Sequence, residues 1–278
     1  MADVRPGSTT SAAASASKAK NSNGFWVNLI IVLVCIVLGF VLFEFVLGSS
    51  SNFEDAEKKI PTSWMGNMYH AGYIVALLLA MLFITIVFVI ERGITIIKAK
   101  GKFNGAELVR KVQYHLANKN IDAAIAECDK QAGSVGNVMK AGLKKYKEMT
   151  FNTELSTDQK VLSIKKELEE ATALELPMLD KNLVFLSTIT SSATLLGLIG
   201  TVIGMIKAFA AMGAAGAPDA SQIAIGISEA LWNTATGIST SFIAMIMYNF
   251  YTTLNDGIGF SIDEGGFTLT QSFAANYK

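Results

Sequence analysis

Two apolar stretches near the C-terminus decide the fold: LVFLSTITSSATLLGLIGTVIGMIKAFAAM at residues 183–212 and QIAIGISEALWNTATGISTSFIAMIMYNFY at residues 222–251. Each is long enough to cross a bilayer, because a transmembrane helix needs about 20 predominantly apolar residues. Each also carries hydroxyls and glycines, and the second carries the carboxylate of Glu229. An acid inside hydrocarbon is costly, so Glu229 is a candidate functional residue.

Small residues recur at intervals of three or four along both stretches. They are Ser187, Thr190, Thr194, Gly197, Thr201, Gly204 and Ala208 on the first, and Ala230, Thr234, Gly237, Ser241 and Ala244 on the second. Such stripes let membrane helices approach closely, and their hydroxyls can line a polar path. The candidate packing residues of this hairpin are Gly197, Gly200, Gly204 and Gly237.

The composition is that of a membrane protein. Of the 278 residues, 51% are hydrophobic and 17% are charged, which is too apolar for an ordinary soluble domain. A formal net charge of zero gives no basic surface for nucleic acid. Cys35 and Cys128 lie far apart and there are two histidines, so the sequence predicts no disulfide framework, metal site or cofactor.

Charge asymmetry orients the chain. Of the 23 lysines and arginines, 16 lie between Arg92 and Lys181, which places that segment in the cytoplasm. Residues 69–97 form a transmembrane helix, and residues 25–47 form an additional one. A signal peptide is the alternative for residues 25–47, but its apolar core would be about 7–15 residues. We therefore predict an all-α membrane protein of four transmembrane helices, with both termini cytoplasmic.

The segments between the spans complete the predicted organisation. Residues 1–24 are rich in Ser, Ala and Thr and read as a disordered tail. The remaining segments are a periplasmic loop at 48–68, a helical cytoplasmic domain at 98–182, the hairpin at 183–251 and a weakly patterned cytoplasmic tail at 252–278.

Within residues 98–182 we expect several helices. Asn104 followed by Glu107 is typical of a capped helix start, and a second short helix spans residues 120–130. A longer helix begins near Ser156, is kinked by Pro177 and continues into the membrane at Leu183. No strand-like alternation favours a catalytic α/β domain.

Equal distance from the turn at Pro218 predicts which side chains of the hairpin share a depth. Thr201 and Thr234 are 17 residues before and 16 after Pro218, and Lys207 and Glu229 are 11 before and 11 after. The two threonines are therefore candidates for a shared polar site. Lys207 and Glu229 are candidates for an ion pair, since either charge alone would be costly.

Plainer roles stay open for each of these residues. Lys207 could extend to the outer interface, Glu229 could be a neutral structural acid, and each hydroxyl could bond its own helix. Glu229 and Thr234 lie about 140° apart around their helix, so the second stretch has two polar faces. Spacing does not tell which face lines a pore.

The strings GLIGTVIG at 197–204 and GISEALWNTATG at 226–237 resemble the ExbB/TolQ family, whose relatives include the flagellar stator protein MotA. The resemblance implies an inner-membrane ring of five copies around an ExbD- or TolR-like dimer of single-span partners. Such complexes use the proton-motive force to drive a TonB- or TolA-like protein. The family's ion-path residues fall on Thr201, Thr234 and Glu229, and its essential aspartate belongs to the partner.

This chain departs from the family pattern in three ways. Family members often carry prolines at the positions of Thr194, Ile225 and Ile243, where this chain has none. Lys207 stands where a neutral residue or histidine is usual. The additional helix at 25–47 could be a lipid-facing brace or a docking site for another subunit.

Several functions remain open alongside an ExbB-like role. A TolQ-like subunit for envelope maintenance and a MotA-like stator would share these helices, and either protons or sodium ions could use paired threonines. A secondary transporter would need internal repeats or broken helices, which the sequence lacks. An intramembrane protease would need a nucleophile and base at membrane depth, so we expect no enzyme. A structural scaffold is the last alternative.

Overall fold

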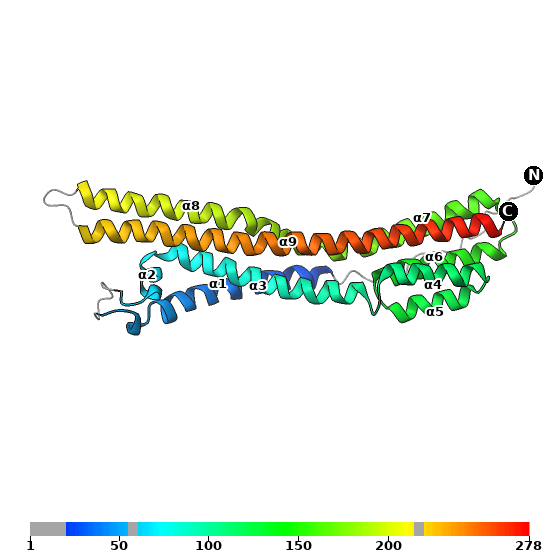
Figure 1. Cartoon of the computed structure of the whole chain (residues 1–278), viewed down its shortest axis with the longest axis horizontal. Helices are drawn as coiled ribbons and strands as arrows, with labels where there is room; N and C mark the ends of the chain where they lie inside the picture. Colours follow the sequence, from blue (N-terminus) through cyan, green and yellow to red (C-terminus); the bar gives the residue numbers. More distant parts are fainter. Residues whose placement is uncertain (1–20, 55–60, 214–219, 278) are drawn as a thin grey trace, which may run out of the picture.

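The computed structural model describes residues 21–54, 61–213 and 220–277 (Figure 1). Nearly all of these residues are helical, and the only β-pairing among them is an isolated bridge between Phe53 and Pro61. The molecule is elongated: α9 (Ala220–Asn276) runs along its length, with α8 (Leu183–Gly213) beside its first half and the group α4–α6 (residues 105–151) beside its second half. The tail predicted at 1–24, except its last four residues, and the turn at Pro218 lie outside the described residues.

Three helical stretches among the described residues are long and apolar enough to cross a membrane: Trp26–Leu47, Tyr73–Ala117 and Thr157–Gly213. The first contains most of α1 (Asn21–Val41) and a π-helical turn, η1 (Leu42–Leu47). The fourth predicted span belongs to α9 (Ala220–Asn276), which is not among the three. Glu229, Asn233 and many hydroxyls dilute its apolar character.

The span predicted at 69–97 is shifted along the chain. A short helix, α2 (Trp64–His70), follows the single-turn η2 (Ser50–Asn52). The main helix, α3 (Tyr73–Lys100), begins only after Gly72, which has φ +81° and ψ −174°. Only glycine adopts that conformation without strain, so the predicted start at Tyr69 was wrong.

Three helices form a bundle against α7 (Thr157–Asp180) and the second half of α9: α4 (Gly105–Ala117), α5 (Ile121–Gln131) and α6 (Ser134–Phe151). Its core holds Leu143, Ile164, Leu269 and Phe273, all fully buried. The buried Gln131 amide accepts from the N–H groups of Gly133 and Gly136 and donates to two carbonyls of the α3–α4 connection.

The predicted helix starts hold, with one difference in capping. Ser156 and Gln159 form a reciprocal capping box at the start of α7, and Asn120 caps α5. Asn104 precedes α4 as expected, but its side chain does not cap the helix. The carbonyl of Asn104 instead accepts from the N–H groups of Glu107 and Leu108.

The long helix expected to run from Ser156 into the membrane is interrupted beyond its proline. Pro177 lies inside the last turn of α7, and its carbonyl accepts the Lys181 N–H at 3.1 Å. The chain leaves the helix at Lys181 and Asn182, where Asn182 has φ +67°, and α8 (Leu183–Gly213) follows. Asparagine is one of the few residues that tolerates this left-handed conformation.

By contrast α9 is unbroken through Asn276 (Figure 1). Its second half is the segment predicted as a weakly patterned tail. Ile258, Ile262, Leu269 and Phe273 recur at intervals of four or seven and are buried against the bundle. That helical spacing was present in the sequence and was missed.

Candidate functional site

The α8–α9 hairpin is held at backbone contact. A Cβ atom added to Gly204 would lie 2.7 Å from both the Ala230 nitrogen and the Gly226 oxygen. One added to Gly237 would lie 2.7 Å from the Ala193 oxygen. No side chain fits at these positions, so the predicted small-residue stripes do bring the two helices together.

The Thr201 and Thr234 hydroxyls are hydrogen-bonded to each other across the hairpin. Both also reach the carbonyl of Gly197, at 3.2 Å from Thr201 and 3.4 Å from Thr234. Both side chains are half-buried, so the pair lies on a face that another molecule can contact. The predicted contact therefore forms, and each hydroxyl also bonds a helix carbonyl.

Lys207 and Glu229 form the predicted ion pair. The Lys207 Nζ lies 2.6 Å from Glu229 Oε1 and 2.9 Å from Oε2. The two partners differ in exposure, at 57% for the Lys207 side chain and 4% for that of Glu229. The carboxylate is thus enclosed by protein, while the lysine reaches it from the surface of the chain.

Glu229 faces the start of α3 as well as α8. A Cβ atom on Gly72 would lie 3.3 Å from Glu229 Oε1. One turn further, the buried Asn233 donates its amide to the Ala71 carbonyl at 3.1 Å. Gly200 accommodates the Asn233 side chain, which would collide with any larger residue there. This polar face of α9 therefore packs against residues 71 and 72, which connect α2 to α3.

The two polar faces of α9 thus have different surroundings. Glu229 and Asn233 are enclosed by α3 and α8, whereas Thr234 is half-exposed beside Thr201. The structure brings the residues together as two separate pairs. The threonine pair is half-exposed, and the Lys207 side chain is exposed beside the enclosed Glu229 carboxylate.

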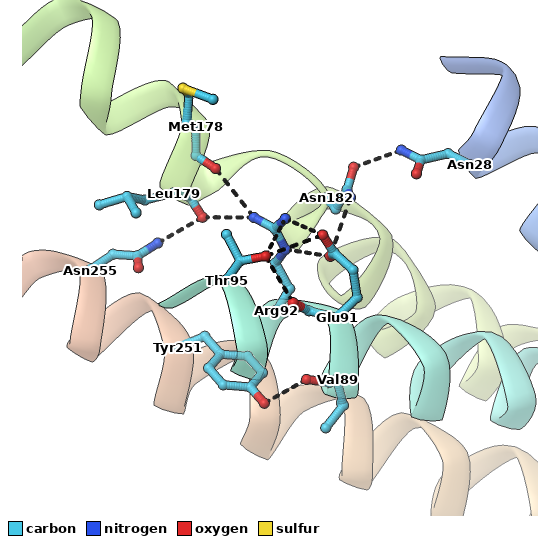
Figure 2. Close-up of polar contacts among 10 residues, drawn as sticks. All are labelled: Asn28, Val89, Glu91, Arg92, Thr95, Met178, Leu179, Asn182, Tyr251 and Asn255. Carbon is cyan, nitrogen blue, oxygen red and sulfur yellow. Dashed lines mark hydrogen bonds and ion pairs between the residues drawn. The ribbon is translucent and has the colours of Figure 1, made fainter. Parts of the chain in front are cut away.

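A second polar cluster, which sequence reasoning missed, lies where α3 passes the α7–α8 break (Figure 2). Arg92 is 3% exposed and donates to the carbonyls of Met178 and Leu179 at 3.3 and 3.2 Å. It also forms two bonds to Glu91, at 2.6 and 2.5 Å. Arg92 therefore satisfies carbonyls at the C-terminal end of α7, which the break leaves without helix partners.

Two asparagines complete this cluster, one on α9 and one at the break itself. Asn255 on α9 donates to the Leu179 carbonyl at 3.1 Å, and Asn182 donates to Glu91 Oε2 at 3.3 Å. The signal that could have found it was weak. An adjacent Glu–Arg pair at the end of an apolar run reads as an interfacial anchor, and the contacts join residues far apart in sequence.

Metal or thiol chemistry gains no support from the described part of the chain, where no group of three or more His, Cys, Asp or Glu side chains is placed to hold a metal. In α5, burial raises the pKa of the Cys128 thiol to about 12. The thiol is therefore protonated at neutral pH and is a poor nucleophile or ligand.

Comparison with known families matches residues 130–263 to the MotA/TolQ/ExbB proton channel family. The chain is similar to a biopolymer transport protein ExbB of Helicobacter pylori, with 42% identity over 30% of this chain and 57% of the relative. A putative ExbB-like protein 3 of Synechocystis is 37% identical over 31% and 42%, respectively. A Tol-Pal system protein TolQ of Pseudomonas aeruginosa is 29% identical over 43% and 55%. The chain spans about half the length of these relatives, and α1–α4 lie outside the family match.

Proposed function

Because the chain belongs to the MotA/TolQ/ExbB proton channel family, we propose that it is a ring-forming subunit of an ion-driven motor in the bacterial inner membrane. In this proposal it energises outer-membrane transport through a TonB-like protein, and both termini are cytoplasmic. One observation carries the proposal: the Thr201–Thr234 hydroxyl pair lies half-exposed on a hairpin packed at backbone contact.

The proposal requires α9 to cross the bilayer beside α8 as a fourth span. Its first half lies against α8 along the hairpin, which supports this (Figure 1). Glu229 is paired with Lys207, and the Asn233 amide nitrogen donates to the Ala71 carbonyl, while the buried Asn233 Oδ1 has no hydrogen-bond partner among the described residues. Polar side chains inside a membrane are tolerated when they are paired and face protein.

In the proposed mechanism, the threonine pair forms part of the wall of an ion path. Hydroxyls both donate and accept hydrogen bonds, so Thr201 and Thr234 can hold a permeant ion or its hydration water beside a carboxylate of an ExbD- or TolR-like partner dimer. Protonating that carboxylate removes its charge and lets the partner helices move within the ring of five copies. The driving energy is about 2.3 kcal/mol per charge per 100 mV.

The direct test replaces both threonines with valine, which keeps their shape and removes the hydroxyls. We expect the T201V/T234V double variant to assemble normally but to lose proton uptake into energised vesicles containing the complex. The matched control is T188V/T253V, because these two exposed hydroxyls bond only carbonyls of their own helices. Full uptake by T201V/T234V would remove the pair from the path.

A TolQ-like role in envelope maintenance is the second candidate, favoured by the match to TolQ over 43% of this chain. The two roles can be distinguished by expressing this chain in cells that lack either the native ExbB or the native TolQ subunit. Restored receptor-dependent uptake supports the ExbB-like role, whereas restored resistance to detergent supports the TolQ-like role. The same vesicles, energised with a sodium gradient in place of a proton gradient, identify the ion.

A further inference from the structure

The break between α7 and α8 at Lys181 and Asn182, here called the joint, is bonded by side chains of three other helices, α3, α9 and α1 (Figure 2). Arg92 from α3 and Asn255 from α9 bond the carbonyls on its α7 side. Asn182, at the joint itself, bonds Glu91 from α3. Asn182 has φ +67°, a left-handed conformation that asparagine tolerates better than most other non-glycine residues.

The third helix is α1, which corresponds to the additional span predicted at residues 25–47. Asn28 on α1 donates its amide to Asn182 Oδ1 at 2.7 Å, the shortest bond that Asn182 makes. One asparagine side chain therefore bridges α1 and α3 and fixes its own backbone between them. Because Asn28 is the one polar side chain in residues 25–41 of α1, bonding its amide at the joint also removes a cost in the membrane.

We propose that the bond between Asn28 and Asn182 lets α1 fix the angle between α7 and α8 at the joint. The hairpin and the bundle then move together as one rigid unit. With the joint held, a displacement of α8 carries α7 with it. With the joint released, the angle between α7 and α8 can vary at residue 182, within the range allowed by α9, which packs against both helices. The inference rests on the proposed function only for its transport readout.

The test of this rigid unit needs no ion transport. Spin labels on cysteines introduced at Leu162 in α7 and Leu195 in α8, both well exposed, report the angle between the helices by pulsed EPR in nanodiscs. Both native cysteines are buried. We expect a single narrow distance distribution in the otherwise unaltered full chain.

Three variants decide the outcome. N182G removes both side-chain bonds while glycine keeps the left-handed backbone, and N28L removes only the bond from α1. Both should at least double the width of the distribution, whereas N28Q, which keeps the amide donor, should restore it. The matched control is N249L, on an exposed face of α9. If N28L fails to fold, the N182G variant alone tests the proposal. A distance distribution in N182G as narrow as in the unaltered chain overturns it.

A transport readout separates positioning from stability. Under the proposed function, N28L and N182G should retain ion uptake within twofold of wild type but lose at least fivefold in energised transport. An equal fall in both activities means a merely structural role and overturns the proposal. If the unaltered chain moves no ion, the proposed function fails, while the EPR result on the joint still stands.

Discussion

The two halves of α9 pack by different means. Along α8, the backbones of α8 and α9 are in direct contact at Gly204, Gly226 and Gly237. Hydrogen bonds across the two helices, such as that from the Ser241 hydroxyl to the Thr190 carbonyl, add to this contact. Along α7, the helices meet through side chains: Leu168 Cδ1 on α7 would lie 3.6 Å from a Cβ atom on Gly266 of α9, and a groove of about 620 Å³ lies between the two helices. One continuous helix therefore uses close contact in one half and side-chain burial in the other.

This difference follows from the solvent expected around each half. Between helices in lipid the hydrophobic effect offers little, because acyl chains are as apolar as leucine, so contact and hydrogen bonds hold the pair. In water, burying large apolar side chains is the main driving force. Four predictions test this contrast, and they are given in order of falling effect.

The largest effect is expected from G204L. A leucine at this position would drive Cβ into the Ala230 nitrogen and the Gly226 oxygen, both backbone atoms that cannot move aside. The hairpin should fail to close, with loss of the folded form in detergent size-exclusion chromatography. The control is G257L, because nothing lies within 4 Å of a Cβ atom there. A folded G204L protein would show that backbone contact is not required.

In the bundle half, L269A should destabilise by about 3 kcal/mol, the usual cost of truncating a buried leucine. Leu269 is fully buried, whereas Leu174 on α7 is 75% exposed and supplies the control L174A. The measurement is the free energy of unfolding from denaturant titration of the protein in detergent. Equal losses for the two variants would contradict burial as the source of stability in this half.

Within the hairpin, K207M should cost about 2 kcal/mol, because it leaves the enclosed Glu229 carboxylate without its partner. The double variant K207M/E229Q should regain most of this loss, since glutamine carries no charge to desolvate. The control K165M breaks an exposed pair at 3.8 Å and should change stability by under about 0.5 kcal/mol. A double variant no more stable than K207M would argue against charge burial.

The smallest effect concerns the pH dependence of the bundle. Burial raises the pKa of the Cys128 thiol from 9.0 to about 12, so the folded protein keeps a proton that the unfolded chain releases. The stabilising contribution is therefore complete below pH 9 and is lost as pH rises towards 12. At pH 10 the free energy of unfolding of the wild type should have fallen by about 1 kcal/mol more than that of C128A, relative to pH 8. If the free energy of unfolding fell equally with pH in the two proteins, burial would not raise the pKa of Cys128.

Sequence reasoning came closest where a local rule applies. Equal distance from Pro218 predicted both cross-hairpin contacts, Thr201 with Thr234 and Lys207 with Glu229, since helical rise fixes depth. Their roles in ion movement stay predictions. Sequence reasoning failed at Gly72 and Asn182, where the backbone angle of one residue decides whether a helix continues. It also missed the periodic core positions of α9 beyond Tyr251.

By itself, the sequence determined an all-helical membrane protein with a small-residue hairpin, because periodicity, apolar length and residue size act within a few turns of one helix. Only the tertiary structure decided that Arg92 and Asn255 bond the carbonyls of α7 and that Asn28 reaches Asn182. Those contacts join residues 76 to 154 positions apart. The bonds from Arg92 and Asn255 arise because carbonyl groups freed at a helix break must find partners, and neighbouring helices supply them.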